Sequence, residues 1–308
     1  MRLLSPAKVN LFLNILSKRK DGYHEIETLF ERISLADEIT LLPAKSRIKI
    51  LSDSPKIPKG AKNLAYRAAK LLKERCHLKR GVIIRIHKRI PIAAGLGGGS
   101  SNAATTLLGL NQLWNLKLSK KELAKLGASL GSDVPFFLSG VKFALGRGRG
   151  EILKKVQAPR LKIWHCLVKP PFGISTKKAY ANLDKSLLAP PPVWPALAGR
   201  SRMDRCKQVV GLTPKASNVK MLLHSIQKGH SATVSKLLTN SLEHALNKRV
   251  KEILEIKKGL MRQGALGCLL SGSGPTVFGI FSSRKKALVA AHFLRKRKRW
   301  QIFVASTF

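Results

Sequence analysis

The chain has 308 residues, 44% of them hydrophobic, which is enough apolar material for two globular domains with buried cores and excludes a disordered chain. There are 58 lysines and arginines against 16 acidic residues, so the formal net charge is 58 − 16 = +42. Such a charge attracts polyanions broadly but says nothing about the fold.

The first predicted element is a strand at residues 6–15, PAKVNLFLNI. Its odd positions are all apolar, and its even positions include Lys8 and Asn10. Period-two alternation therefore points these two polar side chains off the same face. The polar residues also interrupt the apolar run, which excludes a signal-peptide core and a membrane span. We expect a soluble, cytoplasmic protein.

Short strands and one helix are predicted next. DGYH at 21–24 indicates a turn, and strand-like runs continue to about residue 51. Helical spacing of apolar residues predicts a helix at 63–76. The run GVIIRIHKRI, residues 81–90, is β-rich.

The segment PIAAGLGGGSSNAA, residues 91–104, joins that β-rich run to a helix predicted at roughly 101–114. Consecutive glycines can turn several backbone N–H groups toward one concavity. At a helix start, the concavity gains the unpaired N–H groups of the first turn, with Ser100 and Ser101 as candidate caps and hydroxyl donors. The segment is neither a P-loop nor a dinucleotide fingerprint. It favours a phosphate site, with a flexible linker or a tight packing turn as the alternatives.

The pattern changes in the middle of the chain. A helix predicted at 119–130 precedes GSDVPFFLSG, a strand at 141–145 and the turn GRGRGE. Near residue 158 the pattern starts afresh with the strand-like run LKIWHCLVKPP. We therefore predict two domains, 1–157 and 158–308.

The second half begins irregularly. Residues 186–217 hold APPPVWP, an Arg-rich stretch and no sustained period, which predicts an excursion without regular structure. Helical patterns resume at 218–228, 234–246 and 248–263. The strand-like run ALGCLL leads into SGSGP, TVFGIF follows, and a basic helix and QIFVAS close the chain.

The cysteines are widely and irregularly spaced, with no Cys-x-x-Cys pair. They are Cys76, Cys166, Cys206 and Cys268. We expect reduced, mostly structural thiols in a reducing compartment.

With three motifs in the same order along the chain, the sequence resembles the GHMP kinase superfamily of ATP-dependent small-molecule kinases. The motifs are the lysine of PAKVNL, the glycine segment and LLSGSGPTVFGIF. PAKVNLFLNI followed by DGYHEIETLF narrows the resemblance to kinases that phosphorylate the 2-hydroxyl of a CDP-linked sugar alcohol in non-mevalonate isoprenoid synthesis. GSDVPFFLSG, GRGRGE, ISTKKAY and NSLE fit the same branch in the same order.

The resemblance covers nearly the whole chain except the excursion at 186–217, which is longer than is usual in the family. It implies an α+β fold of two domains. The N-terminal domain would have the ribosomal-protein S5 domain 2-like fold, and the C-terminal GHMP domain would be ferredoxin-like. The site would lie in the cleft between them.

The resemblance implies a catalytic pair, Lys8 and Asp133. Asp133 in SDVPFF would take the proton of the acceptor hydroxyl, and Lys8 would hold Asp133 ionised and attract the migrating phosphoryl group. From the residues alone, Asp133 is more simply a helix N-cap ahead of Pro135, and Lys8 a solvated strand residue. Asn10 is expected to contact the substrate beside Lys8.

The resemblance assigns the cytosine of the acceptor to aromatic residues. Tyr23 would stack on the base, His24 would hydrogen-bond to it, and Tyr180 in ISTKKAY would supply the other stacking face. The family also places phenylalanine at this last position. Composition alone favours turn residues with an ordinary buried ring. The Thr176 hydroxyl is a further substrate contact.

The resemblance places ATP with Mg²⁺ on the glycine segment, without a carboxylate cage visible in the sequence. The candidate ATP-binding residues are Pro91, Ile92, Ala93, Ala94, Gly95, Leu96, Gly97, Gly98, Gly99, Ser100, Ser101 and Asn63. For Asn63, a helix N-cap is the alternative. The second glycine cluster, with Gly272 and Ser273, is expected beside the first loop and the substrate's diphosphate, or it is only a hairpin turn.

Two alternative functions stay open at this point. A mevalonate, homoserine or galactose kinase of the same superfamily would share the phosphate loop but lack the cytosine clamp. A basic nucleic-acid-binding protein would explain the +42 charge more simply, yet the charge is diffuse and no binding module is recognisable. We expect salt-sensitive, non-specific polyanion binding as a side property.

Overall fold

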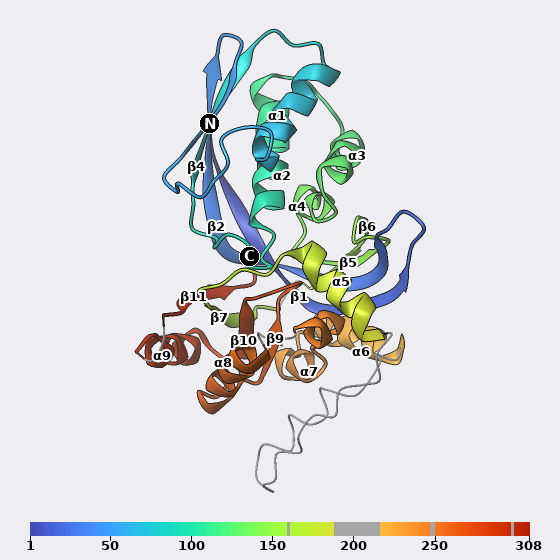
Figure 1. Cartoon of the computed structure of the whole chain (residues 1–308), viewed down its shortest axis with the longest axis vertical. Coiled ribbons are helices and arrows are strands. Elements are labelled where there is room, and N and C mark those ends of the chain that lie inside the picture. The colour runs from blue at the N-terminus through green and yellow to red at the C-terminus, as the bar shows by residue number, and fades with distance from the viewer. Residues whose placement is uncertain (159–160, 188–215, 247–249, 297–298) are drawn as a thin grey trace, which may run out of the picture.

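The computed structural model describes residues 1–158, 161–187, 216–246, 250–296 and 299–308 (Figure 1). The excursion predicted at 186–217 lies almost wholly outside the described residues.

The first sheet has seven strands and is built on one long antiparallel pair. This pair consists of β1 (Arg2–Lys18) and β2 (His24–Ala44). The pair replaces the short strand-like runs expected up to about residue 51, because β2 bends through irregularities of register and does not stop. The other strands are β3 (Ile48–Ser52), β4 (Gly81–His87), β5 (Phe143–Arg147), β6 (Ile152–Val156) and β8 (Thr239–Asn240). The order is β3-β4-β2-β1-β8, with β5 pairing β2 and β6 pairing β5.

Four helices cover one face of this sheet. They are α1 (Leu64–Arg75), α2 (Gly98–Leu113), α3 (Lys120–Leu130) and α4 (Val134–Ser139). The predicted helices at 63–76 and 119–130 are confirmed, and Ser119 caps α3 through a reciprocal pair of hydrogen bonds with Glu122. The buried cluster beneath the helices includes Phe30 of β2, Ala68 of α1 and Leu107 of α2.

The second sheet has four antiparallel strands in the order β11-β7-β10-β9. They are β7 (Trp164–Lys169), β9 (Gly267–Leu270), β10 (Val277–Phe281) and β11 (Gln301–Ser306). Side chains alternate along β7, so Leu167 faces the first sheet while Cys166 and Val168 face α8 (Val250–Arg262) and α9 (Arg284–Arg295).

The two sheets share a buried cluster. Leu29 and Ile33 of β2 meet Leu167 and Phe278 there, and α6 (Ala216–Gln227) and α7 (Ser231–Lys236) close its side. Figure 1 shows α1–α4 and α6–α9 as two groups, with α5 (Thr176–Leu187) between them. The mixed, largely antiparallel arrangement is the α+β class expected from the sequence. The domain boundary after residue 157 stays a prediction.

One helix prediction is wrong. The run at 234–246 was expected to be helical, but α7 ends at Lys236, and β8 and a 3₁₀ turn at Ser241–Ala245 follow. The cause is tertiary, because Thr239 and Asn240 pair with β1 and the Asn240 Nδ2 donates to the carbonyls of Leu270 and Gly272. Local helical spacing loses to these longer-range bonds.

Three of the four cysteines lie among the described residues, and none of these three is in a disulfide. They are Cys76, Cys166 and Cys268. Burial raises the pKa of Cys166 to about 12, so this thiol is an inert core residue. Cys206 lies outside the described residues.

Candidate active site

The first glycine loop ends in the N-terminus of α2. The N-cap is Gly97, whose φ of +68° is the left-handed conformation that favours glycine, and it makes no side-chain cap. The helix therefore begins at Gly98, three residues before the predicted start, and Ser100 and Ser101 are not caps. The backbone N–H groups of residues 98–100 have no helix carbonyl to pair with. They are suited to bind phosphate oxygens.

Ser101 faces the protein interior and not the loop. Its side chain is fully buried and accepts a hydrogen bond from the Ser5 hydroxyl at 2.8 Å, and its N–H donates to the Gly97 carbonyl at 2.9 Å. Of the two predicted hydroxyl donors, only Ser100 is partly exposed. The structure therefore gives the Ser101 hydroxyl a structural contact in place of the predicted role at the phosphates.

The second glycine loop packs directly on the first. The Ser271 hydroxyl donates to the Gly95 carbonyl at 3.0 Å, and a Cβ atom at Gly95 would lie 2.1 Å from the Ser271 carbonyl oxygen. Gly272, with φ of +54°, lies so close to Lys8 and Asn10 that a Cβ atom there would be 3.3 Å from the Lys8 Nζ. The two loops thus meet above Lys8, as the sequence predicted.

Lys8 and Asn10 share one face of β1 and are both buried. The Lys8 Nζ donates to the Asn10 Oδ1 at 2.7 Å and lies 3.4 Å from the Asp133 Oδ2. Asn10 Nδ2 in turn donates to the Thr28 hydroxyl at 2.8 Å, and Thr28 donates to the Phe12 carbonyl. The chain of bonds fixes the ammonium beside the carboxylate.

Asp133 precedes α4 at the N-cap position. A helix N-cap was the alternative to a catalytic role for this residue. Its side chain makes no capping hydrogen bond, and 30% of the side chain is exposed beside Lys8. The carboxylate therefore stands open to a molecule that approaches the lysine. This geometry does not support the N-cap interpretation of its side chain.

Among the residues predicted to bind the base, the His24 ring packs against the Tyr180 ring with centroids 4.9 Å apart. The His24 Nε2 lies 2.7 Å from Asp184 Oδ1, and Lys18 donates to Asp184 Oδ2 at 2.7 Å. Burial raises the pKa of the Tyr180 phenol, and the negative charge of Asp133 raises it further. Tyr180 thus lies within electrostatic reach of the candidate catalytic carboxylate.

Tyr23 is placed differently from His24. It is 54% exposed, and the Arg149 guanidinium lies 4.8 Å from the centre of its ring. The described contacts join Tyr180 to His24 and not to Tyr23. A clamp formed by Tyr23 and Tyr180 on either side of a base is therefore not preformed here.

Thr176 links helix α5, which carries Tyr180, to the second glycine loop. Its hydroxyl lies 3.0 Å from the Ser273 hydroxyl, and Ser273 is buried. The structure brings together Lys8, Asn10 and Asp133 with both loops, and Thr176 links them to the helix that carries Tyr180.

Asn63 forms the N-cap of α1. This is the role that the sequence offered as the alternative to a nucleotide contact. Its Oδ1 accepts from the Ala65 N–H at 2.9 Å, and its Nδ2 donates to the Pro58 carbonyl at 2.8 Å. The residue is 7% exposed, so both polar groups are already used. The start of α1 lies beside the first loop, because a Cβ atom at Gly99 would be 3.5 Å from Leu64.

The first part of the glycine segment approaches the turn before α5. Ile92 and Ala93 are exposed, and Pro91 is half-buried. Ala94 is buried, and a Cβ atom at Gly173 would lie 3.1 Å from the Ala93 side chain. These residues form one wall of the loop, and their contact with a nucleotide stays a prediction.

Sequence reasoning missed a buried polar network beneath the start of α2. Asp37 is fully buried and accepts hydrogen bonds from the N–H groups of residues 89–90, from Asn102 Nδ2 and from Lys88 Nζ. Burial lowers the pKa of Lys88, and Asp37 opposes the shift. A Cβ atom at Gly98 would lie 3.2 Å from the Lys88 Nζ, so the Lys88–Asp37 ion pair lies beside the free amides.

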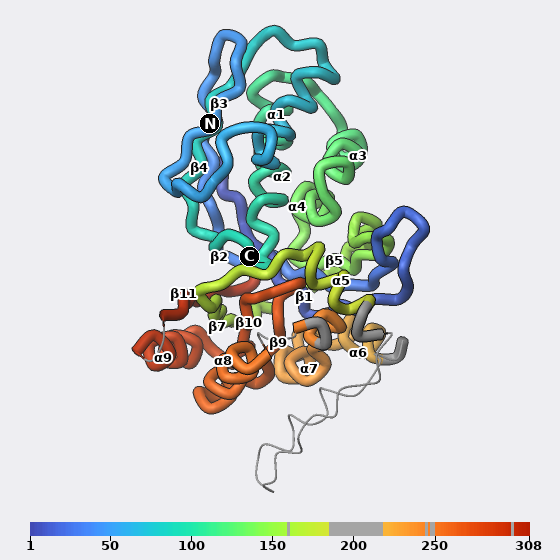
Figure 2. The backbone as a smooth tube through the Cα atoms, in the orientation of Figure 1, coloured from blue at the N-terminus to red at the C-terminus, as the bar shows by residue number. Residues whose placement is uncertain are grey.

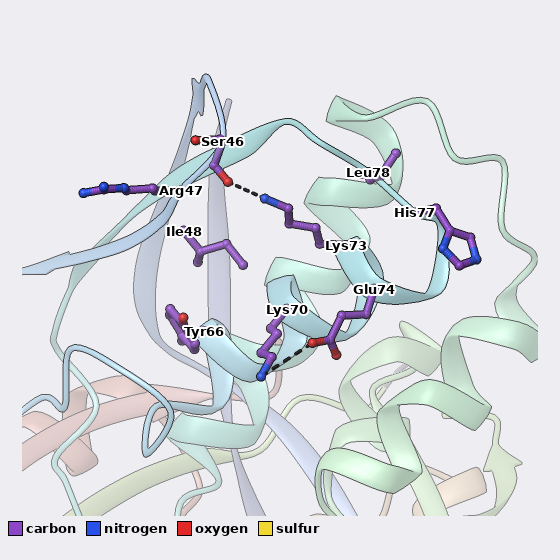
Figure 3. Close-up of a pocket in the computed structure, with 9 residues that line it drawn as sticks. All are labelled: Ser46, Arg47, Ile48, Tyr66, Lys70, Lys73, Glu74, His77 and Leu78. Carbon is purple, nitrogen blue, oxygen red and sulfur yellow. Dashed lines mark hydrogen bonds and ion pairs between the residues drawn. The ribbon is translucent and has the colours of Figure 1, made fainter.

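A cavity of about 670 Å³ lies elsewhere, between the β2–β3 turn and α1 (Figure 3). The described residues that line it are Ser46, Arg47, Ile48, Tyr66, Lys70, Lys73, Glu74, His77 and Leu78. Lys73 donates to the Ser46 carbonyl, Lys70 lies 3.5 Å from Glu74, and His77 points away from the centre (Figure 3). Its charges do not converge, and none of these residues was predicted for the site.

Within the described ranges, every helix is too short or too polar to cross a bilayer. In the same part of the chain, no three His, Cys, Asp or Glu side chains converge where they could bind a metal ion.

Two facing glycine loops above a lysine–aspartate pair, on this fold, define a GHMP kinase. The family model described as the GHMP kinases N terminal domain matches residues 63–141, and the GHMP kinases C terminal model matches residues 222–299. A curated 4-diphosphocytidyl-2-C-methyl-D-erythritol kinase from Pelotomaculum thermopropionicum is 41% identical over 99% of this chain and 97% of its own. A kinase of the same name from Geobacillus kaustophilus is 43% identical over 91% of this chain and 88% of its own.

Solved structures agree with this assignment. A crystal structure of a 4-(cytidine 5'-diphospho)-2C-methyl-D-erythritol kinase is 34% identical, covers 99% of both chains and has a TM-score of 0.75. The homoserine kinase from Cytophaga hutchinsonii, 20% identical with a TM-score of 0.69, covers 100% of this chain and 94% of its own and shows the fold alone. The chain belongs to the 4-diphosphocytidyl-2-C-methyl-D-erythritol kinase family. The predicted family and fold are confirmed, and with them the reaction class of the GHMP kinases, ATP-dependent phosphorylation of a small molecule.

Proposed function

We propose that the chain transfers the γ-phosphoryl group of ATP to the 2-hydroxyl of 4-diphosphocytidyl-2-C-methyl-D-erythritol. The observation that carries this proposal is the Lys8–Asp133 pair, 3.4 Å apart, beneath two glycine loops that touch each other. The acceptor is the compound in the names of the relatives, and its base would bind at His24 and Tyr180, whose rings pack against each other and of which Tyr180 feels the charge of Asp133.

Each step has a candidate residue. Asp133 accepts the proton of the acceptor hydroxyl while the hydroxyl oxygen forms its bond to the γ-phosphorus, and the bond from that phosphorus to ADP breaks. Lys8, held by Asn10, stabilises the negative charge that develops on the transferred group. The free amides of residues 98–100 bind the donor phosphates.

Magnesium would neutralise part of the phosphate charge when it binds with ATP. Since the described residues hold no cluster of acids for it, we propose that it is bound mainly through the nucleotide and water. We further propose that the reaction takes place in the cytoplasm and that residues 1–157 and 158–308 form the two domains.

The proposal is tested by a kinase assay over a panel of acceptors with MgATP. We expect ADP and a 2-phosphate from the CDP-linked acceptor. Asp133→Asn should remain folded and lose at least about a hundredfold in kcat, because the base is removed. Glu74→Gln removes one carboxylate from the distant cavity of Figure 3 and should leave the rate unchanged. An inactive but folded wild-type protein would reject the proposal.

The same panel addresses the near alternatives. Mevalonate, homoserine and galactose should not be phosphorylated. If one of them were the better acceptor, and Tyr23→Ala and Tyr180→Ala left its KM unchanged, the alternative kinase would replace the proposal. The +42 charge supports one side property, salt-sensitive binding of polyanions without sequence preference.

A further inference from the structure

Helix α5 presents three side chains on one face at intervals of four residues: Thr176, Tyr180 and Asp184. Thr176 contacts Ser273 of the second glycine loop, while Tyr180 and Asp184 both contact His24. The eight residue-to-residue steps from Thr176 to Asp184 advance by ~12 Å along the helix. One face of α5 therefore joins the phosphate side of the site to the pocket around His24.

The His24 pocket is assembled from two distant parts of the chain. Figure 2 shows the tip of the β1–β2 hairpin reaching out to α5. Lys18 and His24 lie at the two sides of that tip, and both contact Asp184 on the helix. His24 is 8% exposed, so its ring is held by its neighbours and not by water.

Asp184 determines which nitrogen of His24 carries the hydrogen. An ionised carboxylate only accepts, and its Oδ1 lies 2.7 Å from Nε2, so Nε2 must donate. The hydrogen bond from Lys18, followed by the one from His24, lowers the pKa of Asp184 and keeps this carboxyl ionised at neutral pH. In the neutral ring, Nδ1 is then an acceptor. It has no hydrogen-bond partner in the described part of the chain.

We propose that Asp184 is a positioning residue that makes the pocket select a base bearing an amino group. The inference rests on the proposed function, in which the base is cytosine. An amino group can donate to Nδ1 of His24, whereas the carbonyl that uracil carries at the same position would face the ring's lone pair. Asp184 itself does not touch the base; it acts through the ring of His24.

The test compares the CDP-linked acceptor with its UDP-linked analogue. The wild-type enzyme should prefer the cytidine compound in kcat/KM by about a hundredfold or more. In Asp184→Asn, the amide can either accept from or donate to Nε2, so both tautomers are allowed. The preference should fall about tenfold, through a higher KM for the cytidine compound, with kcat kept because Lys8 and Asp133 are unchanged.

Two control variants separate positioning from general damage. Asp184→Glu keeps a carboxylate and should restore most of the selectivity, and Glu74→Gln should leave it unchanged. A purely structural role for Asp184 would raise both KM values equally and leave their ratio intact, which would overturn the inference. A wild-type enzyme that used neither acceptor would instead reject the proposed function, so the two failures are distinguishable.

Nuclear magnetic resonance gives a readout independent of turnover. The ring nitrogens of His24 can be assigned in protein labelled with ¹⁵N-histidine by comparison with His24→Gln. We expect a protonated Nε2 and an unprotonated Nδ1 in the wild type, and a mixture of tautomers in Asp184→Asn. A hydrogen on Nδ1 in the wild-type protein would contradict the inference.

Discussion

Gly95 shows how strongly a single residue constrains the site. Its φ is +75°, and an added Cβ atom would lie 2.1 Å from the backbone oxygen of Ser271. A side chain there is both strained and sterically blocked. It would force the two loops apart and break their contact. Gly99 has neither problem, because it lies within α2 and its nearest contact is the flexible Leu64 side chain at 3.5 Å.

We therefore predict opposite effects on stability for two chemically identical substitutions. Gly95→Ala should lower the free energy of unfolding by roughly 1–3 kcal/mol and raise the KM for ATP. Gly99→Ala should leave stability unchanged or raise it by up to about 1 kcal/mol, because alanine favours the helix. Denaturant unfolding of both variants checks this. Equal losses of stability would show that the loop contact does not hold the site together.

The sequence could predict residues that obey a local rule. Lys8 and Asn10 share a face because side chains alternate along a strand, and the structure confirms this with a 2.7 Å hydrogen bond. Asp37 and Lys88 obey no such rule, since their partners are 51 positions apart and lie in different strands and loops. Nothing local distinguished Lys88 from the other lysines of a chain so rich in them.

At the scale of elements, β8 and the turn after it hold the second glycine loop in place. The Asn240 Nδ2 donates to the carbonyls of Leu270 and Gly272, both at 2.8 Å, and Asn240 is 4% exposed. Three residues later, Glu243 accepts from the Leu270 N–H and pairs with Lys257. The loop therefore takes its position from a segment whose sequence looks like part of a helix.

Asn240→Leu should leave the two loop carbonyls buried without donors. We expect a loss of about 2–4 kcal/mol in the free energy of unfolding, together with a higher KM for the acceptor. Thr239→Val, at the neighbouring position, is the matched control and should cost less than about 1 kcal/mol. Denaturant unfolding and steady-state kinetics measure the two effects. Unchanged kinetics in a destabilised Asn240→Leu protein would separate this segment from the site.

Helices with their own end signals were predictable, whereas elements set by distant partners were not. Helix α3 has a capping box at Ser119, and α1 has an N-cap at Asn63, so both boundaries could be predicted within about a residue or two. Helix α2 starts early because Gly97 caps it with its backbone conformation alone. The short strand β8 exists only because β1 lies beside it.

At the scale of the whole molecule, the scarcity of acidic groups makes the few that are present important. Five carboxyl groups in the described part of the chain have a pKa held below its ordinary value by hydrogen bonds: Glu38 from Arg2, Asp53 from the Lys88 N–H, Glu122 from the Ser119 N–H, Asp184 from Lys18, and Asp21, where desolvation opposes the bond from the Tyr23 N–H. Since each pKa is lower in the folded state, the unfolded chain takes up these protons first. Their stabilising contribution is present above the unfolded pKa values of 3.8 and 4.5 and is lost as the pH falls through the lower, folded values.

We predict that the Tm falls as the pH is lowered from about 5 to about 3, and that salt reduces the fall. Protonation removes the negative charges that offset 58 cations, and screening weakens the repulsion that remains. At pH 7, raising NaCl from about 0.05 to about 0.5 M should also raise the Tm. Scanning calorimetry across both series measures this. A Tm that decreased with added salt would show that attractive ion pairs dominate the surface.

The contact between Ser271 and Gly95 spans 176 positions of the chain. During synthesis on the ribosome, the first glycine loop and Lys8 emerge long before the segment that must close over them. A nascent chain therefore cannot assemble its complete nucleotide pocket until the second loop has left the exit tunnel.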